Sequence, residues 1–287
     1  MREQTRAPIF CPLLRARYLQ VTRASRHVEL EMAVQLYAMT CGWLSLPEVA
    51  LIEGGSPDPL RIPVPAYLIV HPRGTALFDS GLGTVCQGED TQEYMGDFAA
   101  LMQVEFQDGE EVAVRLEALD VDATKVDYLI NSHLHFDHAG GNDQVSNARL
   151  VIQAREWQAA HEPDLIAKVG YKPVDYDLGH EVLQVEGEHD VFGDGTVTCI
   201  PTYGHTPGHQ SLRVRLEGGD VVLSGDACYL RETLASLRLP PGAAFDREAM
   251  HASLLKLRGL QERGARIFYG HDPEFWRGVP QAPEQTR

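Results

Sequence analysis

Long hydrophobic runs, basic residues and paired cysteines are all scarce in this sequence. No apolar run approaches the roughly 18–20 residues that a membrane-spanning helix requires. The 25 Lys and Arg residues are outnumbered by 41 Asp and Glu residues, which gives a formal net charge of −16. Nucleic acids and anionic membranes both bind positively charged surfaces. We therefore expect neither nucleic acid nor a membrane to be a partner of this chain.

The cysteines do not indicate a disulfide framework. They are odd in number, form no Cys-x-x-Cys pair and are scattered along the chain at Cys11, Cys41, Cys86, Cys199 and Cys228. Scattered thiols of this kind are typical of proteins in a reducing compartment. We expect a cytoplasmic protein whose cysteines are packed as reduced thiols.

The first 33 residues differ from the rest of the chain. They carry six arginines, and their one apolar stretch is broken by Pro8 and Pro12, which makes a poor secretory signal. We expect residues 1–33 to be an extension or arm outside the main fold. Residues 34–287 are expected to form a single catalytic domain, which is long enough to bury a core without disulfides.

The hydrophobic pattern predicts many short strands and a few helices. Strands are expected at residues 34–46, 65–70, 75–79, 126–130, 149–153, 181–185, 196–201, 211–216, 221–223 and 265–269. Helices are expected after a capping box of Asp108 and Glu111, over residues 154–162 up to Pro163, and after Asp246. Strand-rich halves that are each followed by helices predict two sheets packed face to face with helices outside, an α/β (α+β) fold.

The stretch from residue 131 to residue 141 stands out from the rest of the chain. It reads Asn-Ser-His-Leu-His-Phe-Asp-His-Ala-Gly-Gly, so that His133, His135, Asp137 and His138 lie within six positions, directly after an expected strand. His and Asp side chains are zinc ligands. A strand that ends in such a cluster brings these ligands to a loop at the edge of a sheet, where a substrate can reach a metal.

Three later segments have the same character, because each follows an expected strand and each places a glycine before a possible ligand. They contain His205 and His209, Asp226, and His271. One zinc ion needs fewer ligands than these segments and the first cluster supply together. Two metal ions that share a bridging carboxylate are the natural solution.

Together these motifs resemble the metallo-β-lactamase-fold hydrolases. The resemblance implies an αββα sandwich of two mixed sheets, with a site for two Zn²⁺ ions at one edge of the sheets. By motif, it assigns the first zinc to His133, His135 and His205, the second to Asp137, His138 and His271, and the bridge to Asp226. His209 is usually not a ligand in these hydrolases, and we expect it to support the site. We expect Asp79, at the end of an earlier strand, to brace the His133 loop.

A narrower resemblance points to the N-acyl homoserine lactonases. It is carried by Ser-His-Leu-His-Phe-Asp-His-Ala-Gly-Gly-Asn, Gly-His-Thr-Pro-Gly-His-Gln-Ser-Leu, Asp-x-x-Tyr at residues 226–229, and Phe-x-Gly-His-Asp. It implies a homodimeric dizinc hydrolase that opens the lactone ring of N-acyl homoserine lactones with a hydroxide shared by the two ions, which is quorum quenching. It also implies that Tyr229 donates to the substrate carbonyl oxygen. We expect Asp137 to pass a proton to the leaving oxygen.

The substrate pocket and the metal are less strongly indicated. Apolar residues at helical spacing in residues 84–107, together with one from the first cluster, are candidate substrate contacts: Tyr94, Met95, Phe98, Met102 and Phe136. His135 favours zinc, because diiron relatives have a carboxylate at that position and neutral imidazole suits zinc. Mn²⁺, Co²⁺ or Fe in place of zinc are alternatives that the sequence leaves open.

Several other functions remain open at this point. Another lactonase or esterase, or an organophosphate hydrolase, would use the same ligands. A glyoxalase II-like thioesterase would need a C-terminal helical region, and sixteen residues follow His271. A non-catalytic binding module has no physical need for so complete a ligand set.

Overall fold

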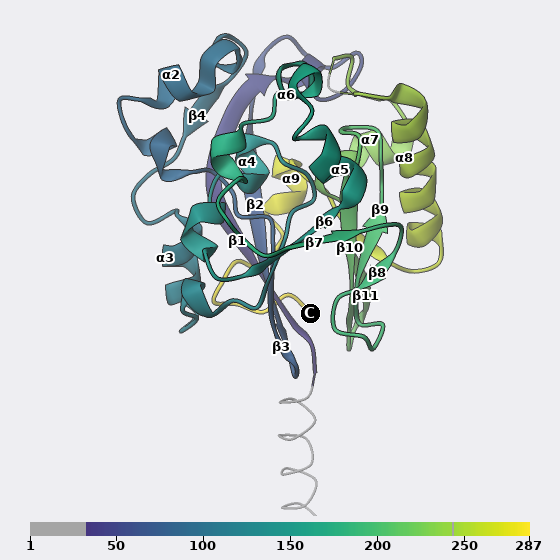
Figure 1. Ribbon diagram of the computed structural model, residues 1–287. Coiled ribbons are helices and arrows are strands. Elements are labelled where there is room, and N and C mark those ends of the chain that lie inside the picture. The colour runs from purple at the N-terminus through teal and green to yellow at the C-terminus, as the bar shows by residue number, and fades with distance from the viewer. Residues whose placement is uncertain (1–32, 243) are drawn as a thin grey trace, which may run out of the picture. The chain divides into compact units, whose positions relative to one another are not determined.

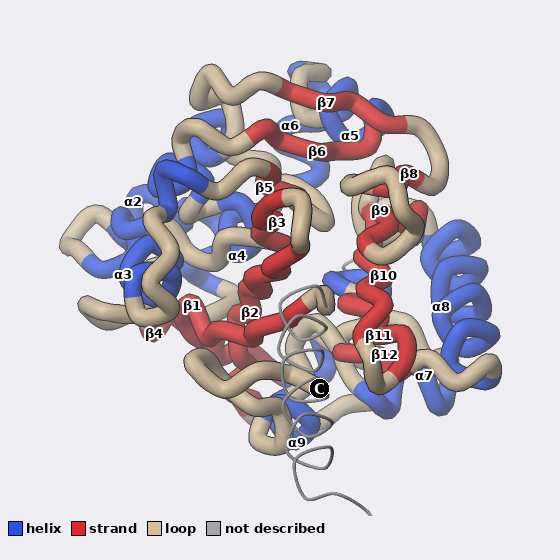
Figure 2. Tube along the Cα trace, turned by 90° about the horizontal axis from the view of Figure 1, so that it is seen from below, coloured by secondary structure: helices blue, strands red, loops and turns tan. Residues whose placement is uncertain are grey.

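Two β-sheets pack face to face in the computed structural model, which describes residues 33–242 and 244–287. Helices cover the outer faces of both sheets, so the layers follow the expected αββα order (Figures 1 and 2). Apart from Ala33, the expected N-terminal extension lies outside the described residues. The fold class predicted from the sequence is confirmed.

The first sheet has seven strands in the order β4-β1-β2-β3-β5-β6-β7. Their bounds are β1 Gln35–Pro47, β2 Pro59–His71, β3 Gly74–Phe78, β4 Gln103–Glu105, β5 Tyr128–Ile130, β6 Arg149–Gln153 and β7 Val182–Val185. Strands β3, β5, β6 and β7 run parallel, and the other pairs are antiparallel. Parallel strands are usually buried on both faces, and four of the five residues of β6 are buried accordingly.

The second sheet has five strands in the order β12-β11-β10-β9-β8. Their bounds are β8 His189–Asp190, β9 Val197–Pro201, β10 Gln210–Leu216, β11 Gly219–Leu223 and β12 Arg266–Phe268. Only β11 and β12 pair in parallel within this sheet. Short glycine-containing turns at residues 191–196 and 217–218 join the antiparallel neighbours β8–β9 and β10–β11.

The helices divide between the two sheets. Along the chain they are α2 Thr91–Met95, α3 Val112–Glu117, α4 Phe136–Ala139, α5 Ala154–Ala159, α6 Pro163–Val169, α7 Arg231–Ser236, α8 Arg247–Glu262 and α9 Pro273–Trp276. Val112 and Leu116 of α3 pack on the outer face of the first sheet. Met250, Leu254 and Leu257 of α8 pack on Val222 and Ile267 of the second. No helix in the described part of the chain is both long and apolar enough to span a membrane.

Two of the predicted helix boundaries are wrong. Pro163 does not end a helix but begins α6, where a proline is tolerated because the first helical N–H has no partner in the helix. Asp108 and Glu111 do not form a capping box, since Glu111 is itself the residue before α3 and makes no side-chain cap bond. Its carboxylate instead accepts a hydrogen bond from the Gly109 N–H at 2.6 Å.

Candidate metal centre

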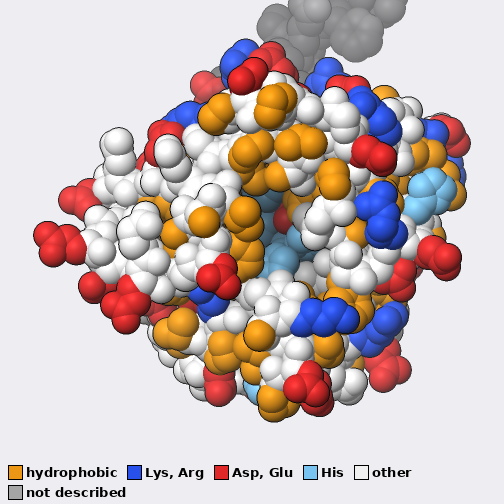
Figure 3. Space-filling view, turned by 90° about the horizontal axis from the view of Figure 1, so that it is seen from above, with side chains coloured by type: hydrophobic (Ala, Val, Ile, Leu, Met, Phe, Trp, Pro, Cys, Tyr) orange, Lys and Arg blue, Asp and Glu red, His pale blue; other side chains and the backbone are white. Residues whose placement is uncertain are grey.

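The carboxyl ends of strands from both sheets meet at one edge of the sandwich. The loop after β5 carries His133 to His138, and the loops after β9, β11 and β12 carry His205, Asp226 and His271. Histidine side chains form the floor of a hollow at this edge, and much of its rim is hydrophobic (Figure 3). Segments 138 residues apart in the sequence therefore build one site.

The first group of possible ligands is His133, His135, His205 and Asp226. Nε2 of His133 and Nδ1 of His135 lie 2.9 Å apart, and Nε2 of His205 lies 3.2 Å from the former and 3.0 Å from the latter. Nε2 of His205 is also 3.3 Å from Oδ2 of Asp226. Ligand atoms around a tetrahedral zinc ion with bonds of about 2.0–2.1 Å are separated by about 3.3 Å. The spacing of these atoms suits such an ion.

The second group is Asp137, His138 and His271. Oδ1 of Asp226 faces this group, at 3.2 Å from Nε2 of His138 and 3.0 Å from Nε2 of His271. Oδ2 of Asp137 lies 3.6 and 3.7 Å from the same two nitrogens. The two oxygens of Asp226 thus point to different groups, which is the arrangement of a carboxylate that bridges two ions.

The donor atoms themselves indicate that cations belong here. Nε2 of His138 and Oδ1 of Asp226 are buried, and although they lie 3.2 Å apart, neither makes a hydrogen bond of acceptable geometry with the described residues. Leaving such atoms unsatisfied costs about 1–3 kcal/mol each. Divalent cations would satisfy both atoms and would neutralise the two carboxylates, so the residues present fit a dinuclear metal centre.

Electrostatics supports the same conclusion for the first group. Burial, with the neighbouring histidines, holds the pKa of His133 well below its usual value, and burial with His205 lowers the pKa of His135 to about 4. Both side chains are therefore neutral at pH 7, and the neutral imidazole is the form that binds metals. Burial would raise the pKa of Asp226, but His138 and His271 outweigh it and hold that pKa well below its usual range.

Asp79 and His209 lie where supporting residues are expected. Asp79 accepts hydrogen bonds from the Ser132 N–H at 2.7 Å and the Ser132 hydroxyl at 2.9 Å, and contacts Nδ1 of His138 at 2.9 Å. Its backbone φ of 57° is strained for a residue other than glycine. Nε2 of His209 accepts a hydrogen bond from the Asp226 N–H at 3.0 Å. This nitrogen therefore supports the backbone of Asp226 and does not act as a metal ligand.

Backbone carbonyl groups orient two of the predicted ligands, and no sequence motif predicted these carbonyl contacts. Nε2 of His135 lies 2.8 Å from the Val169 carbonyl oxygen, and Nδ1 of His271 lies 2.8 Å from that of Pro63. A hydrogen bond at the second ring nitrogen fixes which nitrogen is free to bind a metal. Any residue supplies a carbonyl, so the sequence carries no signal for these contacts.

Glu156 on α5 is a buried carboxylate that the sequence analysis missed. It accepts hydrogen bonds from the Leu134 N–H at 3.2 Å, the Thr206 hydroxyl at 2.7 Å and the Gly208 N–H at 2.8 Å. It therefore ties the loop of His133 and His135 to the loop of His205. Its spacing from Ala159 and Ala160 places it on the same helix face as these two buried residues. That spacing is the sequence signal that could have indicated a buried carboxylate.

Tyr229 lies beside both groups, and Asp137 belongs to the second. The Tyr229 hydroxyl lies 3.2 Å from Nδ1 of His205, and its ring centroid lies 5.7 Å from that of His271. Burial raises the pKa of Tyr229 well above its usual value, so the phenol keeps its proton at neutral pH. The arrangement places a hydrogen-bond donor and a carboxylate beside the histidines.

The candidate substrate contacts also come together. The ring of Phe136 lies 6.4 Å from that of Tyr94 and 5.9 Å from that of Phe98, measured between centroids. Met95 and Met102 belong to the same apolar cluster, which reaches Tyr229. We refer to the rings of Tyr94, Phe98 and Phe136 as the aromatic wall.

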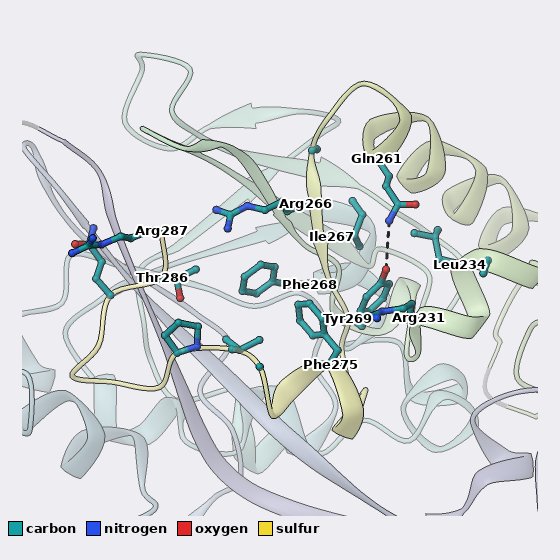
Figure 4. Close-up of a pocket in the computed structure, with 16 residues that line it drawn as sticks. Arg231, Leu234, Gln261, Arg266, Ile267, Phe268, Tyr269, Phe275, Thr286 and Arg287 are labelled. Carbon is teal, nitrogen blue, oxygen red and sulfur yellow. Dashed lines mark hydrogen bonds between the residues drawn. The ribbon is translucent and has the colours of Figure 1, made fainter.

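A cavity of about 670 Å³ lies elsewhere in the molecule, beside β12 (Figure 4). Phe268, Tyr269 and Phe275 contribute to its lining, with Arg231 and Arg287 at its rim. None of the predicted site residues lines it. The histidine-floored hollow, and not this cavity, is the candidate active site.

Comparisons with known proteins agree with the fold. The profile of the Metallo-beta-lactamase superfamily matches residues 60–271. The N-acyl homoserine lactonase AttM of Azorhizobium caulinodans is 34% identical over 259 residues, which cover 87% of this chain and 97% of that protein. The Agrobacterium fabrum AttM is 33% identical over 260 residues, with 88% and 98% covered.

A solved structure shows the same similarity. It is an N-acyl homoserine lactone hydrolase with the product N-hexanoyl-L-homoserine bound at its catalytic metal center. It aligns with a TM-score of 0.78 at 28% identity and covers 88% of this chain and 99% of that chain.

Proposed function

This chain belongs to the metallo-β-lactamase superfamily, and from that premise we propose that it is a metal-dependent hydrolase that opens the lactone ring of N-acyl homoserine lactones, the reaction of quorum quenching. One observation carries the proposal: two groups of ligands face each other across Asp226, with the Tyr229 hydroxyl beside them. The N-acyl homoserine lactonases that resemble it over nearly their whole length support the choice of substrate.

We propose that both ions are zinc, because five of the seven ligands are imidazoles. His133, His135 and His205 would hold the first ion, Asp137, His138 and His271 would hold the second, and Asp226, whose two oxygens face the two groups, would be a ligand for both. When bound, the two cations supply Lewis acidity, which lowers the pKa of a water molecule and polarises the lactone carbonyl. Residues 34–287 are proposed to be the catalytic domain that holds them.

The side chains around the ions then complete the hydrolysis. Water adds to the lactone carbonyl carbon, and the Tyr229 hydroxyl donates a hydrogen bond to the oxygen that gains negative charge. The bond between that carbon and the ring oxygen breaks. Asp137 carries one proton of the attacking water to the departing ring oxygen, which becomes the hydroxyl group of the product. The carboxylic acid formed at the former carbonyl carbon loses the remaining proton to solvent, so that the acyl homoserine leaves as a carboxylate.

A product assay tests the proposal. Acyl homoserine lactones, γ-butyrolactone, S-lactoylglutathione and paraoxon are offered to the zinc-loaded protein, and acid release is followed by pH. We expect turnover of the acyl homoserine lactones, and loss of it in His271→Ala. The control is His251→Ala, which removes an exposed histidine of α8. Turnover of S-lactoylglutathione or paraoxon alone would contradict the proposal.

We further propose that the protein is a cytoplasmic homodimer. Buried, unpaired Cys41, Cys86, Cys199 and Cys228 support a reducing compartment, and the homodimer rests on the family resemblance. Cell fractionation checks the compartment, and light scattering of the purified chain checks its mass in solution. A mass of 31.8 kDa, that of one chain, would contradict the dimer.

A further inference from the structure

The segment from Val169, the last residue of α6, to Asp175 contacts both the metal centre and the aromatic wall. At its start, the Val169 carbonyl oxygen lies 2.8 Å from Nε2 of the ligand His135. Six residues further on, Asp175 is buried and lies against Tyr94, a residue of the wall. One short stretch of chain is therefore in a position to set the wall relative to the metal ligands.

Two side chains of this segment hold Tyr94. The Tyr94 hydroxyl donates to Oδ2 of Asp175 at 2.6 Å, a short bond of the kind that a charged acceptor makes. Nζ of Lys172 donates to the Tyr94 carbonyl oxygen at 2.5 Å and lies 4.6 Å from the centre of the Tyr94 ring. We call Asp175 and Lys172 the tether.

The second ring of the wall rests on the same segment. Phe98 lies over Gly170, whose φ is +89°, and a Cβ atom at that position would come within 2.6 Å of the Phe98 ring. Only a glycine leaves room for this contact. The segment thus supports the wall at Tyr94 and at Phe98.

Helix α2, which carries Tyr94, has few anchors of its own. Helix α2 has five residues and no side-chain cap, and Met95 is its one buried residue. A helix this short is unstable on its own, so its position depends on contacts with the rest of the protein. The tether supplies such contacts from outside residues 84–107.

We propose that Asp175 and Lys172 are positioning residues that fix the Tyr94 ring of the aromatic wall against Phe136 and so determine how well the enzyme accepts long acyl chains. This inference rests on the proposed lactonase function. Phe136 directly precedes the ligand Asp137, so the wall begins at the reacting group and extends away from it. A long chain lies along the wall, whereas a short chain ends before reaching Tyr94. Each methylene that loses an apolar contact weakens binding by up to about fourfold.

Removing the tether should therefore affect long substrates selectively. We expect Asp175→Ala and Lys172→Met to raise KM for N-decanoyl homoserine lactone about 5–10-fold, the effect of losing one to two methylene contacts. The kcat for that substrate and both constants for N-butanoyl homoserine lactone should stay within about twofold. Asp175→Asn keeps an oxygen that accepts the Tyr94 hydroxyl and should restore the wild-type KM. The matched control is Asp177→Ala, on the same loop, where the side chain is exposed.

A double-mutant cycle separates the tether from general loosening. If Asp175 acts through Tyr94, then Tyr94→Phe combined with Asp175→Ala should raise the N-decanoyl KM no further than the larger single change. Additive effects, equal changes for both chain lengths, or a change confined to kcat would overturn the inference.

Hydrogen exchange keeps this test distinct from that of the function itself. Asp175→Ala should speed amide exchange in residues 91–101 and leave residues 250–257 of α8 unchanged. Unchanged exchange in residues 91–101 would overturn the tether whatever the substrate. If the metal-loaded wild type opens no acyl homoserine lactone, the proposed function is wrong. Faster exchange in Asp175→Ala would then still show that Asp175 holds residues 91–101 in place, but the inferred role in substrate choice would be overturned with the function.

Discussion

At the scale of single residues, Tyr229 has the most direct effect on the reaction. Removal of one donor to a developing oxyanion typically slows catalysis by about 10²–10³-fold. We expect Tyr229→Phe to lower kcat within that range and to keep both metal ions, because the hydroxyl is not among the possible ligands. Steady-state kinetics and elemental analysis check this. A wild-type kcat in the variant would remove Tyr229 from the mechanism.

Asp137 is both a ligand and the proposed proton carrier, so its variant needs two readouts. Asp137→Asn keeps the size of the side chain and an oxygen that can bind a metal, but cannot carry a proton as a carboxylate does. We expect a large loss of kcat. The second ion should bind less tightly but should still be present at saturating zinc. A variant with both ions and the full rate would show that another group moves the proton.

Glu156 should affect metal binding without touching the metal. Its carboxylate holds two ligand loops through Leu134, Thr206 and Gly208, and loss of such outer contacts typically lowers metal affinity about 10–100-fold. We expect that loss in Glu156→Gln, measured by competition with a chromophoric chelator. Glu162→Gln, at an exposed site nearby, is the control. Equal affinities in the two variants would leave Glu156 a purely structural role.

Asp175 should make stability depend on pH. Burial raises the pKa of its carboxyl from 3.8 to about 6, with Tyr94 and Lys172 opposing the rise and Asp143 adding to it. The folded protein thus binds this proton more tightly than the unfolded chain, so the stabilisation is complete below about pH 4 and is lost as the pH rises through about 6. Asp175→Asn has no such titration.

We therefore expect Asp175→Asn to be more stable than the wild type at pH 7–8 and to unfold at a higher urea concentration. The free energy of unfolding should be larger by up to about 3 kcal/mol. The difference should shrink as the pH falls below about 6. Urea titrations at several pH values measure it. A difference that is constant with pH would show that this carboxyl does not titrate in the expected range.

At the scale of elements, the helix α8 carries much of the outer layer on the second sheet. Leu254 has no exposed surface and packs with Met250 and Leu257. We expect Leu254→Ala to lower the free energy of unfolding by about 2–5 kcal/mol, since the cavity adds to the lost transfer energy. Chemical denaturation checks the loss, and kcat at 25 °C should be nearly unchanged. Leu255→Ala, at an exposed site on the same helix, should cost far less.

The same scale shows what the sequence could predict. Most strands and α8 were predicted within a few residues, because their apolar spacing and the Asp246 cap are local signals. The short strands β4 and β8 were missed, and β2 begins six residues before its predicted start. Residues 84–107 gave a weak pattern, and they fold into short helices that are held mostly by distant contacts. Pro163 was misread because a proline marks a helix start as readily as a stop.

The candidate ligands were predictable for a similar reason, since each lies in a short motif after a strand. The groups that orient them were not. Asp175 and Tyr94 are 81 residues apart, and His271 and Pro63 are 208 residues apart. Their pairing depends on how the two sheets meet, which local patterns do not encode.

At the scale of the whole molecule, the site joins the two sheets. His133 and His135 follow a strand of the first sheet, whereas His205, Asp226 and His271 follow strands of the second. Removal of the ions should therefore destabilise the whole fold. A ligand present at about a thousand times its Kd stabilises by about 4 kcal/mol, so we expect a chelator to lower Tm by about 10 °C.

Calorimetry with and without chelator measures this shift, and added zinc should reverse it. The variant His271→Ala, which has lost one ligand, should show a smaller shift than the wild type. An unchanged Tm after complete removal of metal would mean that the sheets hold together without it.

The position of these ligands across the seam has a consequence for the life of the protein in the cell. If removal of the ions destabilises the fold as expected, the sandwich would open more often at this edge when divalent cations are scarce and would expose its interior to proteases. Metal shortage would then reduce the number of molecules as well as the turnover of each one, and signal degradation would fall more steeply than metal occupancy alone.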